Sequence, residues 1–286
     1  MSSSPITITC KDGYILQGTF YPKQKQHDAL PIVLSPATGI LQRFYQPFAE
    51  WLAAQGYDVL SFDFRGIGES LHGKVSESAA TIQDWGTYDL PAAIDTLRQK
   101  TGSDKVYVIG HSAGGQLLGL AYNHDKVEKV IAVAGSSGYV KGLSGKSRFL
   151  GPLMFNVIFP ISSLIKGYGA TQFIGMGENL PKGVAKQWAD FCNAGGYVTS
   201  AIGKTIHTHY HDEIRTPITS IHATDDEIAT LANVKDFLRT FPNTKTEIIT
   251  LQPQDYGHKA IGHMLMFRPK HQNLWPVIEQ ELHQAS

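Results

Sequence analysis

The sequence predicts an α/β fold with a mostly parallel central sheet flanked by helices. Short apolar runs alternate with segments whose apolar residues recur at helical spacing, which is typical of a parallel sheet covered on both faces. The alternation holds over residues 1–135, breaks over 136–212 and resumes over 213–286. A length of 286 residues suits one large core with an insertion. We therefore expect a core formed by 1–135 and 213–286, with 136–212 inserted as a cap.

The first part of the chain contains most of the expected strands. Residues 6–10 and 15–21 alternate between apolar and polar around an Asp-Gly pair and predict a β-hairpin. Helical spacing over 44–55 ends at Gly56, a residue type favoured just beyond helix ends. The same patterns predict the remaining elements, which are strands at 31–34, 58–62, 105–109 and 129–134 and a helix at 84–100.

The inserted segment is rich in glycine and aromatic residues and has few strand signals. After it the pattern resumes, with strands at 218–222 and 247–251, a helix near 231–241 and a closing helix at 274–282. Ligands of open parallel sheets bind at the carboxyl ends of the strands. The loops that follow the predicted strands are therefore the candidates for a functional site.

Composition and charge exclude several classes of function. The 25 basic and 25 acidic side chains balance without a basic cluster, so nothing indicates a nucleic-acid partner. The start of the chain lacks the basic and apolar regions of a signal peptide, and Cys10 and Cys192 are too few for a disulfide framework. We expect a cytoplasmic protein with both thiols reduced. We also expect no transmembrane segment, because the nearest candidate, 149–165, contains prolines and polar residues.

Residues 110–114, Gly-His-Ser-Ala-Gly, form the most informative motif. They follow the apolar run 106–109 and precede a second apolar stretch, so the order is strand, Gly-x-Ser-x-Gly, helix. A sharp turn there would lift Ser112 out of the sheet as an exposed nucleophile. Small residues two positions away on either side would avoid a clash across that turn. A plain tight turn is the alternative interpretation.

A serine hydroxyl needs an imidazole to accept its proton and a carboxylate to orient that imidazole. The first strand after the insertion is followed by Asp225 and Asp226, of which we favour Asp226 as the acid. Either aspartate could instead cap the next helix or shape the turn. The following strand leads to two Gly-His pairs, which end at His258 and His263. We favour His263 because an apolar anchor follows it, and His258 is the alternative.

A nucleophile of this kind also needs two N–H donors to form an oxyanion hole. One is Ala113, the residue after the serine. The other should come from the loop after the strand at 31–34, where Pro36 has no N–H and leaves Ala37 or Thr38. We favour Ala37, with Thr38 as the alternate. A simple turn at the end of the strand is the other interpretation.

The alternating histidines at 207–211 could bind a metal only if they shared one face of a strand. They lie at the expected junction of cap and core, and we interpret them as structural polar contacts. The chemistry assigned to Ser112 requires neither a metal nor a cofactor, so we expect none.

Together these residues resemble the serine-nucleophile branch of the α/β-hydrolase superfamily. The resemblance covers nearly the whole chain outside the insertion, and the order nucleophile, acid, histidine matches. Asp63 and Arg65 resemble part of a turn that is common after the fourth strand of that family, and we interpret them as residues that tie loops together. The motifs at 37–39, 65–68 and 261–263 are similar to those of mostly uncharacterised bacterial α/β hydrolases. The oxyanion loop lacks the family's His-Gly patterns, which weakens the interpretation as a lipase or a tertiary-alcohol esterase.

The resemblance implies a serine hydrolase that cleaves an ester, thioester or related acyl bond through an acyl-enzyme. We expect a hydrolase of the carboxylesterase or thioesterase kind. The alternatives are an acyltransferase that uses the same residues and a binding protein that has lost turnover. The apolar stretch 149–165 of the cap favours a small lipophilic acyl substrate if it faces Ser112. The alternative is that this stretch only packs on the core. The sequence leaves the substrate and the oligomeric state open.

Overall fold

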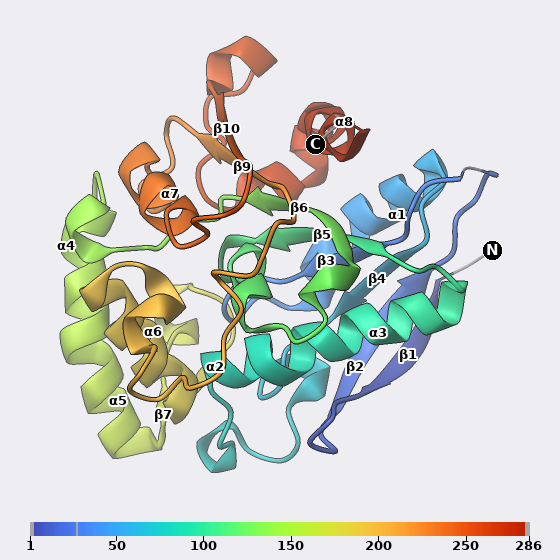
Figure 1. Cartoon of the computed structure of the whole chain (residues 1–286). Coiled ribbons are helices and arrows are strands. Elements are labelled where there is room, and N and C mark those ends of the chain that lie inside the picture. The colour runs from blue at the N-terminus through green and yellow to red at the C-terminus, as the bar shows by residue number, and fades with distance from the viewer. Residues whose placement is uncertain (1–2, 27, 284–286) are drawn as a thin grey trace.

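The computed structural model describes residues 3–26 and 28–283, which are built around an eight-stranded sheet (Figure 1). The β1–β2 and β2–β4 pairs are antiparallel and the other pairs in this sheet are parallel, so the predicted α/β class is confirmed. From one edge to the other the strands are β1 (Ser4–Thr9), β2 (Ile15–Tyr21), β4 (Val59–Phe62), β3 (Ile32–Ser35), β5 (Val106–His111), β6 (Val127–Val133), β9 (Ile218–Ala223) and β10 (Thr246–Leu251).

Side chains of the central strands alternate between two apolar cores, one on each face of the sheet. In β3, Val33 belongs to one core, whereas Ile32 and Leu34 belong to the other. Because both faces are covered, such a strand is an unbroken apolar run in the sequence. The first core is covered by α3 (Leu90–Thr101) and α7 (Leu231–Leu238), and the second by α1 (Gln46–Gln55) and α8 (Trp275–His283).

The helix expected at 84–100 is longer than predicted and runs without a break over residues 82–101. Thr81 caps its start, since the Thr81 hydroxyl accepts the N–H of Asp84 while the Asp84 carboxylate accepts the N–H of Thr81. A π turn, Trp85–Asp89, ends just before Pro91. Proline lacks an N–H and its ring crowds the preceding turn, so the wider turn lets the helix continue past it.

The continuous helix expected after Ser112 does not form. Two short 3-10 turns, Ser112–Gly115 and Leu117–Leu120, take its place. The several glycines in this stretch lower its helix propensity. Gly119 also lies directly against the ring of His211, which leaves no room for a side chain. The strand therefore ends in a sharp turn, but the turn leads into irregular backbone.

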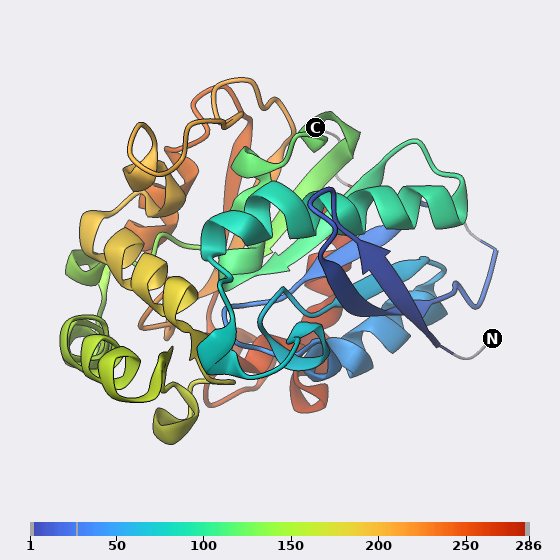
Figure 2. The same cartoon turned by 90° about the horizontal axis from the view of Figure 1, so that it is seen from below.

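The helices of the segment predicted as a cap lie together beside one end of the sheet (Figure 2). It contains two runs of helix separated by a small hairpin. The elements are α4 (Ser147–Leu153), a π turn (Met154–Ile158), α5 (Phe159–Lys166), β7 (Tyr168–Gly169), β8 (Leu180–Pro181), α6 (Lys182–Ala194) and a 3-10 turn (Tyr197–Ala201).

The first run of helix in this segment is continuous over residues 147–166. Its π turn ends just before Pro160, as the π turn of the helix at 82–101 ends before Pro91, so its prolines do not interrupt it. Within the described residues it is the one helix that is long and apolar enough to cross a membrane by length and composition. The sequence had predicted no such segment. Met154 and Phe155 on its inner side are nevertheless buried in the protein core.

Arg65 lies at the centre of a buried ionic cluster beside β4. Its guanidinium bonds to the carboxylates of Asp89 and Asp12, each at 2.6 Å. The Asp89 side chain is fully buried, whereas that of Asp12 is 30% exposed. Asp63, two residues before Arg65, accepts the backbone N–H of Gln42 at 2.7 Å. These bonds connect the N-terminal hairpin, the loop after β4 and the helix at 82–101.

We predict that Arg65→Met lowers the free energy of unfolding by about 3–5 kcal/mol, because it leaves the buried Asp89 carboxylate without its counter-ion. Asp12→Asn is the matched control and should cost about 1 kcal/mol or less, since Asp12 is partly solvated. Urea denaturation of both variants measures the difference. Equal losses would show that the buried Asp89 pair is not the dominant interaction of the cluster.

Candidate active site

Ser112 follows the end of β5 in a left-handed backbone conformation, with φ of 49°. This conformation is uncommon for a residue with a side chain and persists only where the surroundings enforce it. The backbone of Gly110 packs against Gly115, and that of Gly114 packs against the carbonyl of Ser35, so a side chain on either glycine would collide. The turn leaves Ser112 half-buried and places it on the wall of a cavity.

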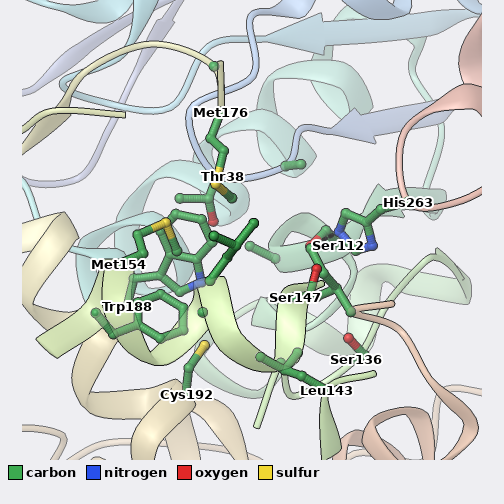
Figure 3. Close-up of a pocket in the computed structure, with 18 of the residues that line it drawn as sticks. Thr38, Ser112, Ser136, Leu143, Ser147, Met154, Met176, Trp188, Cys192 and His263 are labelled. Atoms are coloured by element: carbon green, nitrogen blue, oxygen red, sulfur yellow. Dashed lines mark hydrogen bonds between the residues drawn. The ribbon is translucent and has the colours of Figure 1, made fainter. Parts of the chain in front are cut away.

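Ser112, His263 and Asp226 come from three loops and form a continuous hydrogen-bonded line. His263 Nε2 lies 3.0 Å from Ser112 Oγ, as the dashed line in Figure 3 marks, and His263 Nδ1 lies 2.8 Å from Asp226 Oδ2. Because an ionised carboxylate can only accept, Nδ1 donates to Asp226 and Nε2 is left to accept the serine proton. This is the geometry that activation of a serine requires.

Asp226 is held firmly in place. Its Oδ1 accepts the N–H groups of Ile228 and Ala229, both at 2.8 Å, while its Oδ2 faces His263. Burial raises the pKa of Asp226, but His263 and the two N–H donors outweigh burial, so the pKa lies below its ordinary value. The carboxylate therefore stays ionised at neutral pH and keeps the imidazole oriented.

The neighbouring Asp225 makes different contacts. Its two carboxylate oxygens accept the N–H groups of Ile261 and Gly262, at 2.9 and 3.0 Å. Asp225 therefore fixes the backbone of the loop that carries His263, whereas the imidazole ring bonds to Asp226. The two adjacent aspartates thus have different roles, since Asp226 orients the His263 ring and Asp225 holds the backbone before His263.

His258, the alternative histidine, lies in an exposed network away from the serine. Its Nε2 is 2.7 Å from the Asn273 side-chain oxygen, and its ring stacks on His271. The structure therefore brings His263, and not His258, to Ser112.

The backbone N–H of Ala37, the favoured oxyanion donor, already donates a hydrogen bond within the protein. It donates to the Tyr45 hydroxyl oxygen at 2.9 Å in a buried bond. Thr38 is the next residue with an N–H, and both it and Ala113 line the cavity beside Ser112. The N–H of Ala113 lies in the first turn of a 3-10 helix, where no intrahelical acceptor is available. Of the two candidates, Ala37 thus has its N–H engaged by Tyr45, which leaves Thr38 as the candidate partner of Ala113.

A buried chain of hydrogen bonds lies behind Ser112, and no sequence motif indicates it. His111 Nε2 lies 2.8 Å from the carbonyl oxygen of His263, and His111 Nδ1 lies 2.8 Å from the Tyr45 hydroxyl. A carbonyl only accepts, so Nε2 carries the ring proton, Tyr45 donates to Nδ1, and Ala37 donates to Tyr45. Burial and the neighbouring His263 lower the pKa of His111 to about 3, so the ring is neutral and the bond directions are fixed.

A cavity of about 430 Å3 opens beside Ser112 and His263 (Figure 3). Its volume lies within the range of small-molecule sites. Apolar side chains from the helix at 147–166 and from α6 form much of the wall, and Figure 3 shows Trp188 and Cys192 on the side away from His263. No sequence motif marks either residue as part of the site. Their spacing of four on one helix could have shown that they share a face.

The histidines at 207–211 do not form a metal site. Within the described part of the chain, no group of three or more histidine, cysteine, aspartate or glutamate side chains is arranged to hold a metal ion. The buried His211 packs on the ring of Phe241 and against the backbone of Gly119. Both cysteines are buried free thiols.

Comparison with known proteins agrees with this fold. A family model described as alpha/beta hydrolase fold matches residues 37–156, the segment that contains Ser112. The chain is an α/β-hydrolase-fold protein. A soluble variant of monoglyceride lipase from Saccharomyces cerevisiae, solved with a substrate analogue, superposes with a TM-score of 0.67 at 15% identity. The match covers 97% of this chain and 94% of that one, and the resemblance stated from the sequence is confirmed.

Curated relatives of this α/β-hydrolase-fold protein are named lipases. Lipase lipl-1 of Caenorhabditis elegans is 29% identical over 198 residues, which is 61% of this chain and 46% of the relative. Gastric triacylglycerol lipase of Homo sapiens is 28% identical over 176 residues, 53% of this chain and 44% of the relative. The chain spans about half the length of the curated relatives it matches.

We predict that Tyr45→Phe lowers kcat on the order of 10- to 100-fold with little change in KM, because the loop of Ala37 and Thr38 loses its tie to His111. It should also cost about 1–3 kcal/mol of stability through the unpaired Ala37 N–H. Steady-state kinetics and urea denaturation measure the two effects. Tyr107→Phe, at the other end of β5, is the control, and equal kcat values for the two variants would contradict the positioning role.

Proposed function

We propose that the protein is a serine hydrolase that cleaves esters of lipophilic acids. The observation that carries this proposal is the line from Ser112 through His263 to Asp226 at the wall of an apolar cavity. An activated serine needs a neighbouring base and an oriented imidazole, and the three side chains supply both. The relatives named lipases, and the shared fold of a monoglyceride lipase, support an ester as the bond attacked.

In the proposed reaction, Ser112 Oγ attacks the acyl carbonyl carbon while His263 Nε2 takes the serine proton. The N–H groups of Thr38 and Ala113 stabilise the negative charge that develops on the carbonyl oxygen. The carbon–oxygen bond to the alcohol then breaks, and His263 delivers its proton to the departing alcohol. Water attacks the acyl-enzyme by the same route, which releases the carboxylic acid and restores Ser112. A thioester would react in the same way with a thiol as the leaving group.

The cavity supports a lipophilic acyl group. Its lining includes Leu143, Met154, Phe155 and Trp188, which offer apolar surface and few hydrogen-bonding groups. Burying a hydrocarbon chain there removes its surface from water, which favours longer acyl chains until the cavity is filled.

We predict that a fluorophosphonate probe labels Ser112 in the native protein and that Ser112→Ala abolishes labelling. The same change should lower ester hydrolysis at least about a thousandfold, because the remaining groups cannot form an acyl-enzyme. Peptide mapping of the labelled protein and hydrolysis of a short soluble ester are the measurements. Heat-denatured protein is the control for non-specific labelling. Retention of most activity by the folded Ser112→Ala protein would contradict the assignment.

We further predict that kcat/KM rises with acyl length along a series of p-nitrophenyl esters, starting from acetate. Each methylene that enters the cavity is worth about 0.8 kcal/mol, or roughly a fourfold gain, until the chain no longer fits. The rates should be compared below the concentrations at which the substrates aggregate. A steady fall from acetate onward would contradict a lipophilic acyl site and favour a small polar acid.

A further inference from the structure

The helix at 147–166 has two faces with different surroundings. On the inner face Met154 and Phe155 are buried and line the cavity, and Phe159 is buried next to them. The outer face is exposed and apolar. Phe149, Ile161, Leu164 and Ile165 have 74%, 52%, 85% and 74% of their surface accessible, and Leu150, Leu153 and Val157 share this outer surface.

We call these seven side chains the outer apolar face. Large apolar side chains with this exposure are rare elsewhere in the described residues. Outside the outer apolar face, the exposed large apolar side chains of the described residues are Phe173, also in the predicted cap, and Leu231 on α7. An apolar patch concentrated on one helix marks a surface that some partner covers, whereas single exposed apolar residues need no explanation.

The charged side chains of the helix itself are of one sign, although Glu227 on a neighbouring loop accepts the N–H of Ser147 at the start of the helix. The segment 147–166 contains no aspartate or glutamate, and its two charged residues, Arg148 and Lys166, stand near its opposite ends. Both are exposed. A helix of about 20 residues is roughly 30 Å long, so the two cations flank an extended apolar strip.

We propose that the outer apolar face docks on an anionic lipid bilayer, with the helix lying flat in the plane of the headgroups. The apolar side chains would enter the boundary of the acyl chains, and Arg148 and Lys166 would face the lipid phosphates. The inner face remains packed on the protein, so the helix lies on the membrane and does not cross it. This docking does not depend on the activity proposed above.

Charge favours a membrane over a second copy of the chain. If two copies paired through this helix in antiparallel orientation, Arg148 of one would approach Lys166 of the other, and parallel pairing would bring identical cations together. No acidic residue of the segment could compensate either contact. Anionic headgroups complement both ends at once.

The docking surface is continuous with the cavity. Leu150 and Leu153 belong to the outer apolar face and also line the cavity that holds Ser112. An acyl chain could therefore pass from the bilayer to the serine along apolar surface. This last step rests on the proposed function, whereas the docking is tested without catalysis.

The test is vesicle co-sedimentation of the Ser112→Ala protein, which leaves the lipids intact. We expect binding to vesicles of phosphatidylcholine with phosphatidylglycerol, and at least about tenfold weaker binding when Leu164→Glu and Ile165→Glu are added. Leu231→Glu, the same change at an exposed leucine on α7, should bind like the parent. Arg148→Gln with Lys166→Gln should lose the preference for anionic over pure phosphatidylcholine vesicles.

Leu164 and Ile165 do not line the cavity, so in the protein with Ser112 their variants should hydrolyse a short soluble ester at the parent rate, which checks folding. Absence of vesicle binding, or equal loss in the Leu231 control, would overturn the proposal. A parent dimer that the Leu164 and Ile165 changes dissociate would overturn it in favour of a second copy as the occupant.

Discussion

The left-handed turn at Ser112 is the constraint on which the site depends. The chain turns sharply at the end of β5, so Ser112 faces the cavity. His111 faces the other way and contacts Phe267 in the core that α1 and α8 cover. The turn is possible because Gly110 and Gly114 let backbone segments approach more closely than any side chain would permit. Strain of this kind has to be offset by the packing around it. The central strands β3, β5 and β6, buried on both faces, supply that rigid support.

His111, in the orientation that this turn gives it, connects two other loops of the site. Through one neutral imidazole and the Tyr45 hydroxyl, the loop of Ala37 is connected to the backbone of His263. The loop of Ala37 and Thr38 and the loop that carries His263 are thus held by the same chain of hydrogen bonds. Asp225 and Asp226 hold the histidine loop from its other side. His111, Tyr45 and Asp226 are buried, so salt screens their bonds little, whereas Asp225 is exposed.

Much of the core could be predicted from the sequence because strand and helix periodicity are local properties. The positions of Ser112, Asp226 and His263 followed from strand ends and motif order. The choice between Ala37 and Thr38 could not, because it depends on the Tyr45 hydroxyl, whose position is set by packing. His111 stood inside the recognised motif, but its role required knowledge of what lies behind the strand. The continuous helix at 147–166 was not predicted from the sequence, because a π turn accommodates a proline that usually interrupts a helix.

We propose that Ser112 reacts at a site whose oxyanion donors are Thr38 and Ala113, with Ala37 held by Tyr45. A crystal structure of the protein inactivated by a phosphonate ester tests it most directly, since the phosphoryl oxygen takes the place of the oxyanion. The account predicts phosphorus on Ser112 Oγ, its oxygen within hydrogen-bond distance of the N–H groups of Thr38 and Ala113, and the bond from Ala37 to Tyr45 intact. An adduct on another residue, or an oxygen bound by Ala37 with Tyr45 displaced, would contradict it.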